Sequence, residues 1–234
     1  MNQRVSIVIP AYNEADTIAA TVEAALSIPE VDEVLVVDDC SGDGTAEAAG
    51  AAGARVVSLP RNSGKGAALN YGIRQARGEV VALLDADLGA SASEARSLLL
   101  PILAGEADVS IACFPQARRK GGFGLVKGLA RNGIRYFTGL EMQSPISGQR
   151  ALRREVLEKL IPLASGYGVE VGMTVDAARY GYRLQEIPVQ MTHKETGRNI
   201  QGFRHRGKQF RDIAFTLLKC YVKYHGKNRS RMVR

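Results

Sequence analysis

A chain of 234 residues with 45% hydrophobic and 24% charged side chains carries enough apolar residues for a core of ordinary size, which excludes a disordered or fibrous protein and predicts one domain. Its apolar runs are short, so we expect neither export nor a transmembrane helix, and we expect a cytoplasmic protein. Cys40, Cys113 and Cys220 lie far apart without a CxxC spacing, which favours reduced structural thiols over a disulfide framework or a zinc site.

Charge is unevenly distributed along the chain. Residues 193–234 hold 12 Lys and Arg against 2 acids, a net charge of +10, whereas the other 192 residues hold 19 basic and 22 acidic side chains, a net charge of −3. A mildly acidic body with a basic C-terminal segment predicts an anionic partner near that end, and phosphorylated substrates, anionic lipid and nucleic acid all qualify. The alternative is a solvated segment that aids solubility.

In the first half, short β-branched runs alternate with helical segments. The expected strands are residues 5–10, 33–39, 54–60 and 79–87, and the expected helices are residues 14–27, a segment from about 45 and residues 66–77. This alternation predicts an α/β fold with a mostly parallel sheet covered on both faces. Ligands bind such sheets beyond the carboxyl ends of the strands, where this chain has PAYNE, DDCSGDGT, PRNSGKG and DADLG.

The second half is less regular. Glycines and cations mix in residues 115–133 without a clear strand, which indicates a loop over a site, followed by a helix up to residue 139. We expect Arg118, Arg119 and Lys120 to close over donor or acceptor, with Arg198 on an opposite basic wall. A helix over residues 152–160 and a strand over 183–189 follow.

Near the C-terminus, apolar residues recur at helical spacing between cations. They are Phe210, Ile213, Ala214, Leu217, Leu218 and Tyr221. This pattern predicts a basic amphipathic helix, for which packing on its own domain is favoured over membrane anchoring.

Two carboxylates end the fourth predicted strand. Asp85 and Asp87 flank one residue, so along an extended backbone both side chains would project to the same side, a geometry suited to Mg²⁺ or Mn²⁺. The alternative is a polar strand end with one Asp capping the next helix. His193 follows the last predicted strand, where it would be either a third metal ligand or a structural histidine.

Two further strand ends carry groups suited to a nucleotide. Asp38 and Asp39 could accept hydrogen bonds from ribose hydroxyls or a base edge. Lys65 lies in a glycine-flanked turn before a helix, where its ammonium and the helix N-terminus would both favour an anion. The GxxxxGK[ST] spacing of a P-loop is absent, which disfavours a nucleotide kinase or an ATPase.

In this order and spacing, VSIVIPAYNE, VVDDCSGDGT, NSGKGAALNYGI and ALLDADL closely resemble the family-2 glycosyltransferases with the GT-A fold, above all bacterial relatives of dolichol-phosphate mannose synthase. The resemblance implies a base and ribose pocket, a lysine near the nucleotide and a metal-binding DxD pair. The corresponding residues are Pro10, Ala11, Tyr12, Glu14 and Asp38 for the pocket, Lys65 for the lysine, and Asp85 and Asp87 for the pair.

A second resemblance covers residues 145–195. SGYGVEVGMTVDAARYG, followed by a His after a strand, is similar to glucosyl-3-phosphoglycerate synthases. This likeness implies that Tyr167, Gly168 and Glu170 lie beside the donor sugar and that His193 completes the metal site. FGLVK lacks the arginine of the corresponding acceptor segment, so the acceptor stays open.

Together these observations predict a GT-A domain over residues 1–205, with a donor half (1–110) and an acceptor half (111–205), followed by a basic helix and tail (206–234). We expect a metal-dependent glycosyltransferase that moves a hexose from a nucleotide-diphosphate sugar, most simply a UDP-sugar, to a phosphorylated or lipid-linked acceptor. Asp87 and Glu170 are the candidate catalytic carboxylates.

Other functions remain as alternatives. They are an inverting polyprenyl-phosphate mannosyl or glucosyl synthase using a GDP- or UDP-sugar, a nucleotidyltransferase, and a module that binds anionic ligands or a membrane surface. PAYNE holds no glycine, unlike the first loop expected of a nucleotidyltransferase. We expect no nucleic-acid partner, and peripheral contact with the inner face of a membrane is left open.

Overall fold

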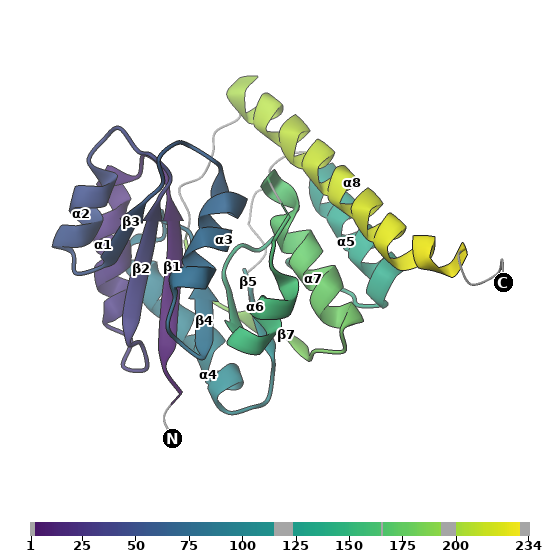
Figure 1. Cartoon of the computed structure of the whole chain (residues 1–234), viewed down its shortest axis with the longest axis horizontal. Coiled ribbons are helices and arrows are strands. Elements are labelled where there is room, and N and C mark those ends of the chain that lie inside the picture. The colour runs from purple at the N-terminus through teal and green to yellow at the C-terminus, as the bar shows by residue number, and fades with distance from the viewer. Residues whose placement is uncertain (1–2, 115–123, 165, 193–199, 230–234) are drawn as a thin grey trace.

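The computed structural model describes residues 3–114, 124–164, 166–192 and 200–229, without the side chains of residues 200–206 and 226–229. Figure 1 shows a twisted central sheet with helices on both faces and one long helix, α8, lying across the outside of the second half. The α/β fold expected from the alternating pattern is confirmed.

Seven strands form one sheet. In sheet order they are β3 (Arg55–Ser58), β2 (Glu33–Asp38), β1 (Val5–Ala11), β4 (Val80–Leu83), β6 (Arg150–Arg153), β5 (Val109–Cys113) and β7 (Leu184–Pro188). β6 runs antiparallel to both of its neighbours, and the other pairs are parallel. The carboxyl ends of β1, β2 and β4 therefore meet at one edge of the sheet, which gathers the polar segments that follow them.

The central strands carry apolar side chains on both faces of the sheet, and helices bury both faces. One face carries α1 (Ala15–Leu26), α2 (Thr45–Ala51), the 3₁₀ helix η1 (Gly89–Ala95) and α4 (Arg96–Leu103). The other face carries α3 (Lys65–Gln75), α5 (Leu125–Thr138), α6 (Arg154–Leu160), the 3₁₀ helix η2 (Gly166–Gly168), α7 (Val169–Arg179) and α8 (Ile200–Arg229). Alternate strand residues belong to the two cores, as the period of a strand requires.

The C-terminal helix α8 packs on its own domain, as the amphipathic pattern favoured. Its inner face buries Ile213 and Cys220 against α5 and α7. The predicted stripe is divided, however, since Phe210, Leu218 and Tyr221 are exposed on the outer face. No helix of the described ranges is long and apolar enough to cross a membrane.

Two predicted boundaries were wrong, both near the site. The fourth strand ends at Leu83, so Asp85 and Asp87 belong to the turn that follows and not to extended backbone. The helix expected over residues 152–160 begins at Arg154, because the residues before it form β6, which the sequence did not reveal. β5 was missed as well.

Close packing of α3 on the sheet depends on Gly72. A Cβ at this position would lie 2.5 Å from Val8 Cγ1 and 2.8 Å from Val37 Cγ2, both on buried strands. We expect Gly72→Ala to lower the free energy of unfolding by about 1–3 kcal/mol, measured by urea unfolding, because a full core cannot take an added methyl group without strain.

The matched control is Gly128→Ala in α5. A Cβ there meets nothing within 4 Å among the described atoms, so the better helix propensity of Ala should leave stability unchanged or raise it by up to about 1 kcal/mol. Equal effects of the two substitutions would contradict the packing argument.

Candidate functional site

A cavity of about 660 Å³ lies at the carboxyl edge of the sheet. Its walls come from the ends of β1, β2 and β4, the start of α3, residues 146–149, η2 with the start of α7, and Lys208 and Gln209 of α8. Of the predicted site residues, those that line it are Pro10, Ala11, Tyr12, Glu14, Lys65, Asp85, Asp87, Tyr167 and Glu170. Residues separated by more than 150 positions thus converge on one space.

The turn after β4 presents both DxD carboxylates to this cavity. It is held against α1, because the hydroxyls of Thr17 and Thr21 donate to the carbonyl of Ala86 at 3.2 and 2.9 Å. The two aspartates therefore share one space although the reason predicted for it, extended backbone, is wrong. Carboxylates of this kind suit hard divalent cations.

Lys65 joins the two halves of the cavity. Its Nζ lies 2.7 Å from Asp85 Oδ1 and 3.2 Å from Glu170 Oε1. Burial alone would lower the pKa of Lys65, but the carboxylates of Asp85 and Glu170 outweigh it and hold the pKa above its ordinary value. The ammonium therefore stays charged throughout the physiological range.

Sequence reasoning missed the contributions of Gly148 and Gln149. Gln149 Nε2 donates to Asp85 Oδ2 at 2.7 Å, and a Cβ on Gly148 would lie 2.8 Å from Lys65 Nζ. A side chain at this position would displace the Lys65 ammonium from the ion pair, so glycine lets the backbone approach it closely. The signal in the sequence was the SGQR segment, which places a glycine and an amide just before the helix expected over residues 152–160.

Arg150 is a fully buried charge behind the cavity. Its Nε donates to the carbonyl of Ser147 and its Nη1 to the hydroxyl of Thr174, both at 2.9 Å, and Thr174 in turn donates to the carbonyl of Glu170 at 2.9 Å. Burial lowers the pKa of Arg150 to about 10, opposed by the Glu170 and Glu186 carboxylates, so the guanidinium remains charged at neutral pH. It fixes the start of α7, and with it Glu170.

The end of β2 differs from the prediction in one detail. Asp39 lines the cavity, whereas Asp38 is buried beside it and accepts a hydrogen bond from the backbone of Ser41 at 3.1 Å. The carboxylate of Asp39 accepts hydrogen bonds from the backbone of Ser63 and Gly64, each at 2.7 Å. It therefore shapes the turn that delivers Lys65.

At the end of β1, Tyr12 and Glu14 form the outer wall. Tyr12 is about half exposed and lines the cavity, so its ring is accessible to a planar ligand. The backbone N–H of Glu14 donates to Thr45 Oγ1 at 2.9 Å, and its carboxylate accepts from Thr17 Oγ1 at 3.1 Å. These bonds tie the strand end to α1 and α2.

The opposite wall rests on α8. The N–H of Tyr167 donates to Asp212 Oδ2 at 3.3 Å, and a Cβ on Gly168 would lie 2.8 Å from Thr216 Cβ. Burial and the Asp212 carboxylate raise the pKa of the Tyr167 hydroxyl, which therefore stays protonated. Gly168 itself is buried and supports the wall from behind.

Several predicted residues lie outside the described ranges: His193, Arg118, Arg119, Lys120 and Arg198. Within the ranges that are described, no three His, Cys, Asp or Glu side chains converge as metal ligands. The third ligand and the lid therefore stay predictions.

The sequence profile described as "Glycosyl transferase family 2" matches residues 6–161. The chain belongs to this family. The family assignment expected from PAYNE, DDCSGDGT, NSGKG and DADL is confirmed.

Curated family-2 relatives include two kinds of enzyme. A glucosyl-3-phosphoglycerate synthase of Mycolicibacterium paratuberculosis is 34% identical over 196 residues, 74% of this chain and 59% of the relative. A polyprenol monophosphomannose synthase of Mycolicibacterium smegmatis is 32% identical, over 83% of this chain and 80% of the relative. The chain thus spans about three fifths of the length of the first relative.

A solved structure matches nearly the whole length of this chain. Glucosyl-3-phosphoglycerate synthase of Mycobacterium tuberculosis, in complex with Mg²⁺ and UDP, has a TM-score of 0.79 and 29% identity, covering 93% of this chain and 79% of that one. The same protein has been crystallised with Mn²⁺, UDP-glucose and phosphoglyceric acid.

The ion pairs of Lys65 generate a stability prediction. Lys65→Ala leaves two neighbouring carboxylates without their shared cation, so we expect the free energy of unfolding to fall by about 1–2 kcal/mol in thermal or urea unfolding. Adding Mn²⁺ should raise the melting temperature of this variant more than that of the wild type, because the ion takes over the role of the ammonium.

Lys159→Ala is the control, since that ammonium stacks on Tyr182 away from the cavity. An Mn²⁺ response no larger in Lys65→Ala than in the control would contradict the electrostatic interpretation.

Proposed function

We propose that this protein is a metal-dependent glycosyltransferase that moves a hexose from a UDP-sugar to a phosphorylated acceptor. The observation that carries the proposal is the convergence of the DxD carboxylates, Lys65 and the β1 end on one cavity in a family-2 chain. UDP-glucose, Mn²⁺ and phosphoglyceric acid in a solved relative support the choice of donor, metal and acceptor class.

In this proposal the nucleotide lies across the strand ends. The ring of Tyr12 would stack on the base, with Pro10, Ala11 and Glu14 forming the rest of its pocket and Asp39 beneath the ribose, backed by the buried Asp38. Lys65 would face the diphosphate. Its charge is maintained at neutral pH, so it would stabilise the negative charge that grows on the departing nucleoside diphosphate.

Asp85 and Asp87 would hold Mg²⁺ or Mn²⁺, with His193 as the predicted third protein ligand. The described lining of the cavity fits such an ion, because it carries five carboxylates against the ammonium groups of Lys65 and Lys208. Once bound, the ion supplies positive charge to the diphosphate. Gln149 would orient Asp85 by its hydrogen bond of 2.7 Å.

Glu170 and Asp87 are the proposed catalytic carboxylates. Both line the cavity, where Tyr167 would adjoin the donor sugar, with the buried Gly168 supporting it from behind. An acceptor that attacks through a phosphate oxygen needs no strong base, whereas a hydroxyl acceptor must give up a proton, and these two carboxylates are placed to assist it.

Donor binding provides the direct test. With Mn²⁺, the wild type should bind UDP-glucose in a calorimetric titration, and Asp87→Ala should weaken this binding at least about tenfold by removing a metal ligand. Titrations with UDP-N-acetylglucosamine and GDP-mannose would identify the sugar and the base.

Glu106→Ala, which removes an exposed acid away from the cavity, is the control. If no nucleotide sugar binds with or without metal, the proposed function is overturned.

We also propose peripheral contact between α8 and an anionic membrane surface. Phe215, Leu218 and Val222 lie three and four positions apart on its outer face and are 58%, 57% and 63% exposed. Lys219 Nζ lies 4.6 Å from the centre of the Phe215 ring, so apolar and cationic groups share this face. Basic amphipathic helices bind anionic lipid through this combination.

In vesicle flotation, the protein should associate with anionic vesicles and not with neutral ones. Leu218→Glu should reduce the bound fraction several-fold, because it places a charge of the wrong sign on the apolar face. Leu100→Glu, at an exposed leucine of α4, is the matched control. Equal binding of both variants would contradict contact through α8.

A further inference from the structure

A second cavity, of about 450 Å³, opens beside α5. It is lined by Phe114, Lys127, Arg131, Asn132, Arg135, Glu141, Met142 and Gln143. Its cations recur every four residues on α5, so Lys127, Arg131 and Arg135 share one face of the helix. Like charges at this spacing destabilise a helix. A bound anion would reduce the repulsion between them.

Among the described residues, only the last of these cations is paired with a carboxylate. Arg135 Nη1 lies 3.5 Å from Glu141 Oε1, an exposed pair that contributes little. Arg131 uses its Nε to donate to the carbonyl of Met142 at 3.0 Å. Its terminal nitrogens and the ammonium of Lys127 have no hydrogen bond or ion pair to any other described residue.

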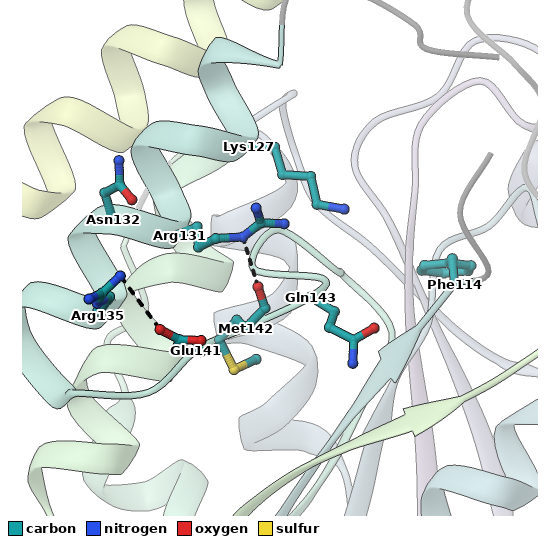
Figure 2. A pocket seen from close by; sticks show the side chains of 8 residues that line it. All are labelled: Phe114, Lys127, Arg131, Asn132, Arg135, Glu141, Met142 and Gln143. Atoms are coloured by element: carbon teal, nitrogen blue, oxygen red, sulfur yellow. Dashed lines mark hydrogen bonds and ion pairs between the residues drawn. The ribbon is translucent and has the colours of Figure 1, made fainter. Parts of the chain in front are cut away.

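Figure 2 shows Lys127 and Arg131 extending from α5 toward the space between this helix and Phe114. Gln143 completes the floor. The thiol of Cys113 donates to Gln143 Oε1 at 3.7 Å, which directs the amide NH₂ of Gln143 away from the thiol.

The floor is fixed from below. Glu186 of β7 accepts hydrogen bonds from the backbone of Gln143 at 2.8 Å and of Ser144 at 2.7 Å. Together with the bond from Arg131, these contacts hold Arg131 and the backbone of Gln143 in place before any ligand arrives, which lowers the cost of binding.

Phe114 lines both cavities, so the second cavity adjoins the donor cavity. The two have opposite charge. Among described residues the donor cavity has five carboxylates and two ammonium groups, whereas the second has three cations and one carboxylate. A metal-loaded donor belongs in the first, and an anion belongs in the second.

We propose that Lys127, Arg131 and Gln143 form the subsite that binds the phosphate monoester of the acceptor. The link to an acceptor rests on the proposed transfer reaction, whereas anion binding at this place does not. A phosphate here would receive charge-assisted hydrogen bonds from two side chains of one helix face and the Gln143 amide. The rest of the acceptor would pass Phe114 toward the donor sugar.

Glycerol 3-phosphate is the soluble probe, titrated by calorimetry without metal. The wild type should bind it, and the double variant Lys127→Met/Arg131→Gln should bind it at least about tenfold more weakly, since two charged donors are lost. The single variant Lys127→Arg keeps the charge and the wild-type Arg131, so it should retain most of the affinity for glycerol 3-phosphate. Arg74→Ala, an exposed cation of α3 that lines neither cavity, should bind as the wild type does.

Binding to vesicles of phosphatidylcholine with or without phosphatidic acid distinguishes a lipid-linked phosphate from a soluble one. If the double variant loses binding to the phosphatidic acid vesicles, the subsite is supported and its phosphate belongs to a lipid. If the double variant loses binding to glycerol 3-phosphate, the subsite is supported and its phosphate belongs to a soluble molecule. Unchanged binding of both probes in the double variant overturns it, as does a wild type that binds neither.

UDP with Mn²⁺ provides the independent readout. The double variant should keep the wild-type affinity for UDP within about twofold, because both substituted residues lie outside the donor cavity. If UDP fails to bind to the wild type while glycerol 3-phosphate binding depends on Lys127 and Arg131, the proposed donor is wrong and the subsite stands. A parallel loss of UDP binding in the double variant overturns the subsite, since it would indicate general damage.

Discussion

The ion pairs of the Lys65 ammonium are the interactions on which the site depends. Within the protein it neutralises Asp85, 20 positions along the chain, and Glu170, 105 positions along, so one cation joins the turn after β4 to the start of α7. The residues around this cation hold it in position. Asp39 shapes the turn that carries the lysine, and Gly148 leaves room for its ammonium. The hydrogen bonds of Arg150 fix the backbone of Glu170 through Thr174. Without this cation, two acids from different halves of the chain would face one another with no positive charge between them.

Local patterns were sufficient to predict which polar segments follow β1, β2 and β4 and insufficient for the rest of the cavity. The strand ends after β1, β2 and β4 each carry their polar groups within a few residues of an apolar run, so reading the runs predicted where those groups would meet. β6 was not predicted because its four residues include Arg150 and Arg153. The neighbouring sequence gives no sign that Arg150 is buried inside the sheet between two antiparallel strands. The shared orientation of the DxD pair was predicted from extended backbone, but a turn anchored by threonines of α1 produces it.

The same limit explains why the cationic cavity could not be predicted. Lys127 and Arg131 are visible in the sequence as part of a glycine-rich basic stretch, but their significance depends on the 141–143 loop that faces them and on Glu186 of β7, which holds that loop. Those partners come together only when β5, β6 and β7 are aligned. The charge contrast between adjoining cavities is therefore a tertiary property, although every side chain that produces it is plain in the sequence.

Helix α8 also decides when the cavity can be completed during synthesis. Gly133 of α5 meets Leu217 so closely that a Cβ there would lie 2.5 Å from Leu217 Cδ1, and Gly168 meets Thr216 in the same way, so the wall that carries Tyr167 is supported from outside by the last helix. During synthesis the segments that follow β1, β2 and β4 emerge first, but the cavity that they line stays open on one side until Lys208 and Gln209 have been added. The part of the molecule that is easiest to recognise in sequence is thus completed by a segment that is synthesised well after it.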